Sequence, residues 1–271
     1  MNRIGVIVTT YNRPDALAAV LDGYLAQADQ NFELVIADDG STDATRALIA
    51  NYQSRSPFDI RHVWQEDQGF RAAAIRNRAL AATESDYIIF TDGDCIPLAT
   101  FIARHRQLAE PGYFLAGNRV LLSESFTQKV LQEKLPVYGW GMGRWISAWV
   151  QGHINRLQPL LHLPDFIALR KRAPHKWHGV KTCNLSAWRT DLLNINGLDE
   201  TYCGWGLEDS DLVVRLIRSG VRHKSARFAA PVLHLWHQEN PRHNLNENQR
   251  RLDAVLSTNR IAATQGVKQY L

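Results

Sequence analysis

The sequence has few cysteines and no long apolar run. Three of its 271 residues are cysteines, and Cys95, Cys183 and Cys203 form no C-x-x-C pair. This spacing disfavours a zinc site or a disulfide framework and fits a reducing compartment. No apolar run of about 18 residues occurs, so no membrane-spanning helix is predicted. Because residues 1–6 also lack a signal-peptide pattern, we expect a cytoplasmic protein.

The glycine-rich loops that usually hold nucleotide phosphates are also absent. No G-x-G-x-x-G follows the first predicted strand, and no G-x-x-x-x-G-K-[ST] occurs. If the chain binds a nucleotide, a metal ion and side chains must therefore neutralise the phosphates. The net charge of +4 is mild, and its distribution along the chain is more informative.

What the first hundred residues do contain is an alternation of apolar strands and amphipathic helices. Strands are predicted at 4–8, 32–37, 60–64 and 87–90, and helices at 14–25, 44–52 and 71–81. This order predicts an α/β fold with a Rossmann-like, mostly parallel sheet flanked by helices. The chain is long enough for one large α/β domain.

Polar residues follow several of these strands, at the edge where ligands collect in open α/β sheets. Asp92-Gly93-Asp94 offers oxygen ligands that suit Mg²⁺ or Mn²⁺ holding a diphosphate. Asp39 can accept a hydrogen bond from a base imide N–H, with Tyr11 beside the base. Arg71, or alternatively Arg76, can reach base or phosphate. Asp-Gly turns, helix caps and a solvated helix face are the structural alternatives for these residues.

Three of these segments together resemble the family 2 glycosyltransferases of the GT-A fold. They are Val8-Thr9-Thr10-Tyr11-Asn12-Arg13, Asp38-Asp39-Gly40-Ser41 and Thr91-Asp92-Gly93-Asp94. The resemblance covers roughly residues 4–100 and implies a nucleotide-sugar donor with a Mn²⁺ or Mg²⁺ cofactor. It assigns nucleoside binding to Thr9, Tyr11, Asp39 and Arg71. It also implies that Asp92 lies near the ribose and that Asp94 binds the metal.

A basic segment rich in tryptophan follows a further strand predicted at 114–122. Between Arg144 and Lys181, seven basic residues accompany one acidic residue, Asp165, which gives a net charge of +6. Four tryptophans are interleaved with this charge: Trp140, Trp145, Trp149 and Trp177. The mixture suits an anionic amphiphile or a membrane surface. Nucleic acid, a packed helical insert with a solvated face, and sugar binding by the indole rings are the alternatives.

The second half contains a compact glycine, tryptophan and acid motif. A strand predicted at 182–188 precedes Gly204-Trp205-Gly206-Leu207-Glu208-Asp209, and a helix is predicted at 212–219. An acidic helix N-terminus favoured by the macrodipole explains the acids but not the Gly-Trp-Gly before them. The motif resembles that of β-1,4-galactosyltransferases and bacterial chondroitin polymerases, although Leu207 replaces a glycine common in the animal enzymes.

This second resemblance implies roles for the residues of the motif. Trp205, Gly206 and Glu208 would contact the donor and acceptor sugars, and Asp209 would be the catalytic base. Successive helical residues point about 100° apart, so we expect only one of the two acids to face the reacting carbon.

Two late histidines follow a strand that ends near residue 237. His237-Gln238-Glu239, with Pro241 and Asn244 after it, resembles a chondroitin polymerase segment. The resemblance therefore favours His237 as a metal ligand over His234, which fits an ordinary loop histidine.

The sequence thus predicts a single GT-A domain over 1–271. Its parts are a nucleotide-binding half (1–122), a basic helical insert (123–181), an acceptor and catalytic half (182–245) and a C-terminal helix (246–271). The predicted reaction is inverting, metal-dependent transfer from a UDP-sugar to a hydroxyl of a glycan or lipid-linked glycan. We expect a role in bacterial cell-surface polysaccharide or lipopolysaccharide synthesis, peripheral contact with the inner face of the cytoplasmic membrane, and no nucleic-acid partner.

Two alternatives stay open at this point. One is a catalytically degenerate GT-A module that binds nucleotide or glycan without transferring sugar. The other is a sugar-nucleotide pyrophosphorylase, which shares the sheet. That class usually carries a glycine-rich, arginine-containing first loop, and residues 9–14 do not form one.

Overall fold

The structure, a computed structural model, describes residues 3–161, 167–238 and 242–271. Its main sheet has seven strands in the order β3-β2-β1-β4-β8-β6-β9. These are β1 (Ile4–Thr10), β2 (Phe32–Asp38), β3 (Ile60–Trp64), β4 (Tyr87–Asp92), β6 (Tyr113–Ala116), β8 (Asn184–Trp188) and β9 (Arg222–Ser225). Strands β1 to β4 pair in parallel, and β6 pairs in parallel with β9. Only β8 runs antiparallel to its neighbours within this sheet, so the predicted mostly parallel α/β sheet is confirmed.

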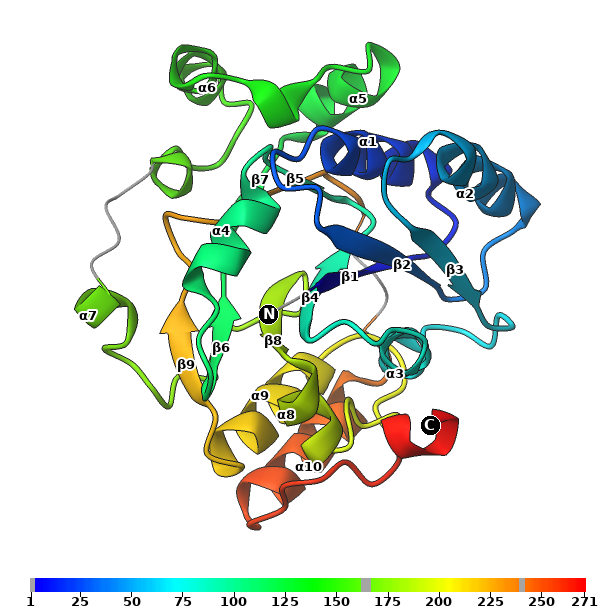
Figure 1. The fold of residues 1–271 in the computed structure, drawn as a ribbon, viewed down its shortest axis with the longest axis vertical. Coiled ribbons are helices and arrows are strands. Elements are labelled where there is room, and N and C mark those ends of the chain that lie inside the picture. The colour runs from blue at the N-terminus through cyan, green and yellow to red at the C-terminus, as the bar shows by residue number, and fades with distance from the viewer. Residues whose placement is uncertain (1–2, 162–166, 239–241) are drawn as a thin grey trace.

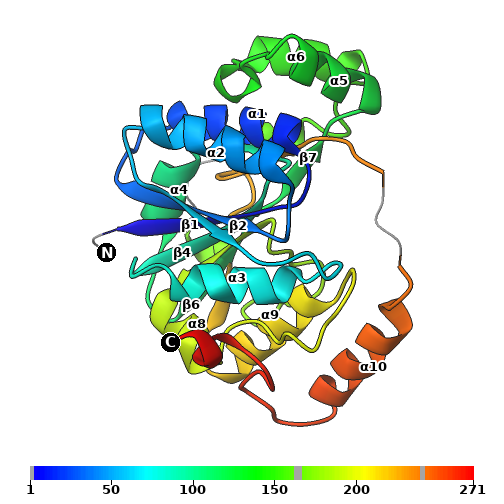
Figure 2. The ribbon, with the colours of Figure 1, turned by 90° about the vertical axis from the view of Figure 1, so that its right-hand side faces the viewer.

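Helices cover both faces of this sheet (Figures 1 and 2). The helices that pack in one core are α1 (Pro14–Leu25), α2 (Asp43–Arg55) and α4 (Phe101–Leu108). Those of the other core are α3 (Ala72–Ala81), α8 (Arg189–Asn194) and α9 (Glu208–Arg218). Alternate residues of one strand serve the two cores: Val6 and Val8 pack in the first and Ile7 in the second. This explains why the buried strands are apolar at nearly every position.

The strand predicted at 114–122 is in fact two strands in different sheets. Between β6 and β7 (Arg119–Leu121), the Gly117 N–H donates to the Asn184 carbonyl at 2.9 Å. A Cβ at Gly117 would collide with the Asn184 side chain, so only glycine permits this close approach. Strand β7 then joins a three-stranded sheet in the order β5 (Cys95–Pro97), β10 (Val232–His234), β7. The same sheet pairs His234 with Cys95, which brings the late histidines beside Asp94.

The basic, tryptophan-rich insert packs on the core with most of its aromatic side chains. It contains α5 (Glu124–Gln132), η1 (Val137–Gly139), α6 (Met142–Val150), η2 (Gln158–Leu160) and α7 (Ile167–Arg170). Trp145 is 2% exposed, and Trp140 and Trp177 pack partly buried against the two cores. Trp149 of α6 is 47% exposed. Asp165, the acidic residue in the charge count, lies outside the described residues.

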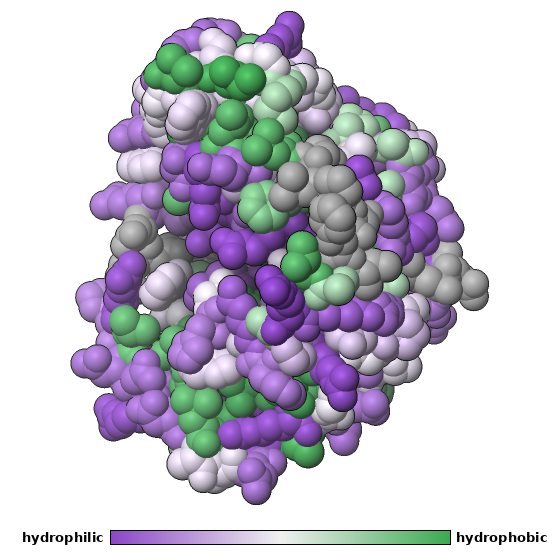
Figure 3. Space-filling view, turned by 90° about the vertical axis from the view of Figure 1, so that its left-hand side faces the viewer, coloured by the Kyte–Doolittle hydropathy of each residue, from purple (hydrophilic) through white to green (hydrophobic). Residues whose placement is uncertain are grey.

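Helices α5 and α6 lie together above α1 in Figure 1, and hydrophobic residues gather at the corresponding end of the molecule in Figure 3. The apolar side chains that α6 exposes are Ile146, Trp149 and Val150. None of the described helices is long and apolar enough to cross a membrane.

The C-terminal part differs from the prediction at two helix boundaries. Helix α9 begins at Glu208 rather than at residue 212, so the acids form its first turn. Helix α10 (Leu245–Leu256) ends well before residue 271, and a short 3-10 helix, η3 (Val267–Tyr270), follows an irregular stretch. The predicted single helix over 246–271 is therefore wrong, because its polar residues after Leu256 bind other parts of the fold.

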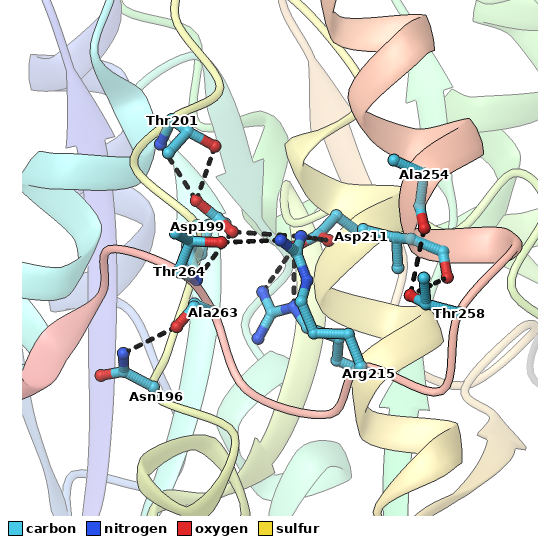
Figure 4. A network of polar contacts seen from close by, with 12 residues as sticks. Asn196, Asp199, Thr201, Asp211, Arg215, Ala254, Thr258, Ala263 and Thr264 are labelled. Carbon is cyan, nitrogen blue, oxygen red and sulfur yellow. Dashed lines mark hydrogen bonds and ion pairs between the residues drawn. The ribbon is translucent and has the colours of Figure 1, made fainter.

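Arg260 of that irregular stretch contacts Asp211, which also forms a buried ion pair within α9 (Figure 4). Arg215 donates to Asp211 at 2.6 Å, and both side chains are fully buried. Arg260 contacts both Asp211 and Asp199, and Asp199 also accepts the Thr264 N–H at 2.9 Å. Asp211 is thus a structural acid, distinct in its contacts from the two acids that precede it in the same helical turn.

Candidate active site

A cavity of about 500 Å³ opens at the carboxyl ends of β1, β2 and β4. The start of α9 and the segment after β10 complete its wall. All but one of the residues predicted for the site line it: Thr9, Tyr11, Asp39, Asp92, Asp94, Trp205, Gly206, Glu208, Asp209, His234 and His237. The topology therefore brings the Asp92-Gly93-Asp94 motif to the Gly204-Trp205-Gly206 motif, which lies more than 100 residues later in the sequence.

Arg71 is the predicted residue that does not line the cavity. Its guanidinium donates to the Glu66 carbonyl at 2.8 Å. Only its backbone N–H reaches the predicted nucleoside pocket, where it donates to Asp39 Oδ2 at 2.8 Å. The contact of the Arg71 side chain with a nucleoside therefore stays a prediction.

Arg76 does line the cavity, as Arg13 and Arg119 also do. Its buried guanidinium donates to Thr9 Oγ1 and to Asp92 Oδ1, both at 2.9 Å, and lies 3.4 Å from Glu208 Oε1. One cation thus links β1, β4 and α9. The sequence marked Arg76 only as an alternative to Arg71, because a helical arginine usually indicates a solvated face.

The predicted nucleoside pocket is formed by Asp39 and Tyr11. Asp39 is buried, and its carboxylate accepts hydrogen bonds from the Arg71 N–H and from Gln65 Nε2. Burial raises the pKa of Asp39 above its ordinary value. The Tyr11 ring is half-exposed, and its hydroxyl donates to Asp67 at 2.9 Å. A flat, accessible ring beside a buried acceptor suits a stacked base with an N–H group.

Asp94 forms a cluster with both late histidines. Its Oδ2 lies 3.3 Å from His237 Nε2 and 3.6 Å from His234 Nε2. The three donor atoms all lie within 4.8 Å of one another, as the ligands of one metal ion would. The fold brings the two histidines to Asp94 equally well, and residues 239–241, which favoured His237 in the sequence, lie outside the described residues.

The metal-ligand types in the Asp94 cluster fit Mn²⁺. Asp92 is held apart from this cluster by its contact with Arg76. One carboxylate and two imidazoles, with open space in front, leave positions for diphosphate oxygens. Burial raises the pKa of Asp92 to about 6 despite the Arg76 charge, and Asp94 adds to the rise. Asp92 also groups with Cys95 and Cys183, but soft thiols are poor ligands for Mg²⁺ or Mn²⁺.

The two acids at the start of α9 both line the cavity, but they have different partners. Asp209 accepts a hydrogen bond from the Thr182 hydroxyl at 2.5 Å and lies 3.7 Å from Lys181 Nζ. Glu208 contacts Arg76 instead. Burial, and then the neighbouring Asp209 carboxylate, raise the pKa of Glu208 to about 7. An acid whose pKa is raised in this way is typical of a functional site.

The Gly-Trp-Gly segment positions this helix start. Gly204 and Gly206 have positive φ angles of 73° and 106°, which glycine adopts readily. Leu207 also has a positive φ, 75°, and is the residue that precedes the first turn of α9. The Trp205 ring lies 4.7 Å from the Arg242 guanidinium, and its indole faces the cavity.

Three basic residues of the cavity, Arg13, Arg119 and Lys181, were not assigned to the site by the sequence. Arg119 comes from β7, and Lys181 precedes β8. Arg119 lay within a predicted apolar strand, and Lys181 belonged to the basic segment. The strand is interrupted at Gly117, and this interruption places Arg119 in the cavity wall. It has no strong signal in the sequence.

Comparison with known proteins agrees with this geometry. The model of the family described as Glycosyl transferase family 2 matches residues 5–178. The chain belongs to glycosyltransferase family 2. A second model, described as the N-terminal domain of galactosyltransferase, matches residues 166–238, which include the Gly-Trp-Gly and acid motif. Both predicted resemblances are therefore confirmed.

Relatives of this family 2 glycosyltransferase include a glucosyltransferase and a polysaccharide synthase. Validoxylamine A glucosyltransferase from Streptomyces hygroscopicus subsp. limoneus is 29% identical over 80% of this chain and 48% of its own length. Chondroitin synthase from Escherichia coli is 25% identical over 88% of this chain and 35% of its own length. The chain thus spans about half the length of the first relative and about a third of the second.

Solved structures show that the fold is GT-A. The S. aureus TarS 1–349 complex with UDP-GlcNAc aligns with a TM-score of 0.61 at 14% identity, covering 99% of this chain and 69% of TarS 1–349. The mannosyltransferase PcManGT from Pyrobaculum calidifontis, in complex with GDP-Man and Mn²⁺, aligns with a TM-score of 0.59 at 18% identity. This alignment covers 88% of this chain and 58% of PcManGT.

Proposed function

We propose that this family 2 glycosyltransferase transfers a sugar from a UDP-sugar to an acceptor hydroxyl with inversion at the anomeric carbon. The observation that carries the proposal is the composition of one cavity. It contains a metal-ligand cluster around Asp94, a base pocket at Asp39 and the carboxylate pair Glu208 and Asp209. These groups meet the separate needs of a nucleotide leaving group and a hydroxyl nucleophile.

The donor half of the cavity supports a uridine diphosphate sugar. Asp39 accepts the imide N–H of uracil, and Tyr11 stacks beside the base. Thr9 and Asp92 both accept hydrogen bonds from Arg76. They lie near the ribose that is attached to the base. TarS was solved with UDP and with UDP-GlcNAc, and PcManGT with GDP-Man, which supports a nucleotide-sugar donor.

Asp94, His234 and His237 are the residues that would hold Mn²⁺ or Mg²⁺. When bound there, the cation supplies charge that offsets the negative charge of the leaving diphosphate. PcManGT was solved with Mn²⁺, which supports the same cofactor class here.

Asp209 is the proposed general base. The acceptor hydroxyl oxygen attacks the anomeric carbon from the face opposite UDP, and its proton passes to an Asp209 carboxylate oxygen. The bond from that carbon to the diphosphate oxygen breaks, and its electron pair leaves with UDP. The Thr182 hydroxyl holds one Asp209 oxygen and fixes the carboxylate orientation. Glu208 and Trp205 bind sugar hydroxyls and the sugar ring face.

The proposed acceptor is a glycan or lipid-linked glycan of bacterial cell-surface polysaccharide synthesis. Two proteins similar to this chain are named as polysaccharide synthases: the E. coli chondroitin synthase and the Pasteurella multocida hyaluronan synthase. Helix α6 exposes Ile146, Trp149 and Val150, which suit peripheral contact with the cytoplasmic membrane that carries lipid-linked substrates.

Titration calorimetry of UDP with and without Mn²⁺ tests the donor and metal assignments. We expect UDP to bind in Mn²⁺ and to lose about tenfold or more affinity in excess chelator, because the diphosphate loses its main counter-charge. The double variant His234→Ala/His237→Ala should bind UDP in Mn²⁺ as weakly as the wild type does in chelator. The control His175→Ala removes an exposed histidine away from the cavity. Equal UDP affinity in Mn²⁺ and in chelator contradicts the metal site.

A further inference from the structure

A second, smaller cavity of about 160 Å³ adjoins the active site. It shares Arg119, Lys181 and Cys183 with the main cavity. Six basic side chains line it: Arg119, Arg156, Lys176, Lys181, His223 and Arg227. Its described lining contains no aspartate or glutamate. A small cavity with this composition has a strongly positive potential.

The charges of this cavity are poorly neutralised by the protein itself. Across the described residues, Arg119, Arg156, Lys176 and Arg227 form no ion pair with a carboxylate within 4.0 Å. The Arg156 side chain is half-buried, and its Nε is buried without a hydrogen-bond partner. Arg119 is also half-buried, whereas Lys176 and Arg227 are exposed at the cavity mouth. An unpaired cation in a partly buried place is costly, and a bound anion removes that cost.

The basic side chains also act on one another. Burial lowers the pKa of His223, and the nearby charges of Lys176 and Arg227 lower it further. The Nδ1 of His223 contacts the Ala173 carbonyl at 3.0 Å, which holds the ring in the cavity wall. By contrast, other cations of the same basic segment have partners: Lys171, for example, pairs with Glu110 at 2.6 Å. Two cations of the insert, Arg156 and Lys176, thus line this cavity without such a partner.

We propose that this cavity binds an anionic group of the acceptor, a phosphate or a carboxylate close to the hydroxyl that receives the sugar. The position supports the acceptor over the donor, because Lys181 lies 3.7 Å from the proposed base, Asp209. Four of the basic side chains line this cavity and not the main cavity: Arg156, Lys176, His223 and Arg227. The inference rests on the proposed function for the identity of the base, and it names the chemical class of the acceptor.

Titration of small anionic sugars tests the proposal without knowledge of the natural acceptor. Glucose 6-phosphate, glucuronate and uncharged methyl glucoside are titrated in chelator without nucleotide, against wild type and Lys176→Gln/Arg227→Gln. The control Lys129→Gln/Lys268→Gln removes the same charge from exposed positions outside both cavities. UDP affinity in Mn²⁺ is measured for every variant.

We expect the wild type and the control to bind at least one anionic sugar at least about tenfold more tightly than Lys176→Gln/Arg227→Gln does, with UDP affinity unchanged. A preference for glucose 6-phosphate indicates a phosphate-bearing acceptor, and one for glucuronate indicates a carboxylate-bearing one. No anion binding by the wild type, equal binding of methyl glucoside, equal binding by the cavity variant, or loss of UDP affinity in that variant overturns the proposal. If UDP fails to bind the wild type but the anionic sugars follow the expected pattern, the donor assignment fails and the anion site stands.

Discussion

Two neighbouring carboxylates of the active site differ through the cations and hydroxyls they contact. Glu208 faces the buried Arg76, whereas Asp209 faces the Thr182 hydroxyl and the more exposed Lys181. Both line the same cavity, and the expectation that only one of them faces the reacting carbon stays a prediction. Their partners distinguish the roles, since Arg76 also fixes Thr9 and Asp92 on the donor side.

The variant Asp209→Asn tests the general base. Asparagine keeps a side-chain oxygen that accepts the Thr182 hydrogen bond, but it cannot take a proton from the acceptor. We expect kcat to fall by about 10²–10⁴-fold, the usual contribution of general-base catalysis. UDP affinity in Mn²⁺, measured by calorimetry, should stay near that of the wild type. A near-normal kcat would remove Asp209 from this role and favour Glu208.

The raised pKa of Glu208 predicts a dependence of stability on pH. Its folded-state pKa, about 7, lies above the ordinary value of 4.5. The protonated form is therefore favoured by folding, and this stability is complete below pH 4.5 and is lost as pH rises through 7. Chemical denaturation in chelator should show that Glu208→Gln loses less stability than the wild type between pH 5 and pH 8. One unit of pKa corresponds to about 1.4 kcal/mol, so the difference should exceed that value. Parallel stability profiles for the two proteins would contradict it.

At the scale of elements, the turn before α9 has an unusual backbone. Leu207 has a φ of 75° at the N-cap position, where its side chain offers no capping hydrogen bond. This left-handed conformation costs a residue with a Cβ roughly 1–2 kcal/mol. The turn aims the next two residues, Glu208 and Asp209, into the cavity, so strain and function coincide here.

A pair of substitutions at Leu207 isolates this strain. Leu207→Ala removes the side chain and keeps the Cβ, whereas Leu207→Gly also removes the Cβ. We expect the glycine variant to unfold with a free energy about 1 kcal/mol higher than that of the alanine variant. Urea denaturation of both variants measures the difference. If alanine proves the more stable, the positive φ of this turn is not a source of strain.

The sequence predicted the elements of the first half well and those of the second half less well. Strands such as 87–90 are continuous apolar runs bounded by polar loops, which is a local signal. The strand at 114–122 looked equally continuous, but Gly117 divides it because of contact with Asn184, a residue distant in sequence. Likewise, the predicted α-helix does not continue past Leu256, where Arg260 instead binds Asp199 and Asp211 across the fold.

The same reasoning explains which site residues could be predicted. Asp94, Asp209 and His237 belong to short motifs whose chemistry is visible in the sequence. Arg76 and Arg119 carry no motif, and their positions depend on tertiary contacts. A basic residue in a helix or a strand usually marks a solvated face, so only the assembled sheet identifies these two as cavity residues.

At the scale of the whole molecule, the insert turns one helix face outward. Val150 is 74% exposed, and Ile146 and Trp149 lie on the same helix, whereas Trp145 points into the core. The packed-insert interpretation therefore holds for most of the tryptophans. The exposed apolar side chains of α6 are not explained by packing of the insert on the core. They suit shallow insertion between lipid headgroups.

Vesicle binding tests this surface. Ile146→Ser/Val150→Ser should bind anionic vesicles about tenfold more weakly than the wild type in a sedimentation assay, because apolar burial at the interface is lost. Ile261→Ser/Leu271→Ser removes two comparable exposed side chains and should bind normally. Wild-type binding should also fall as salt rises, because surface charge is screened. Equal binding of all three proteins, or of anionic and neutral vesicles, contradicts membrane contact by α6.

The contacts of α3 have a consequence for recombining this enzyme with its relatives. Asn77 donates to the Leu198 carbonyl and accepts the Leu198 N–H, and it also contacts Glu200. Its neighbour Arg76 reaches Glu208, so the helix that follows the donor loops carries the anchor points of the acceptor half. A chimaera that exchanges residues 182–245 alone would separate partners that fit each other. New acceptor specificities are better grafted with α3 included, or confined to the loops between these anchors.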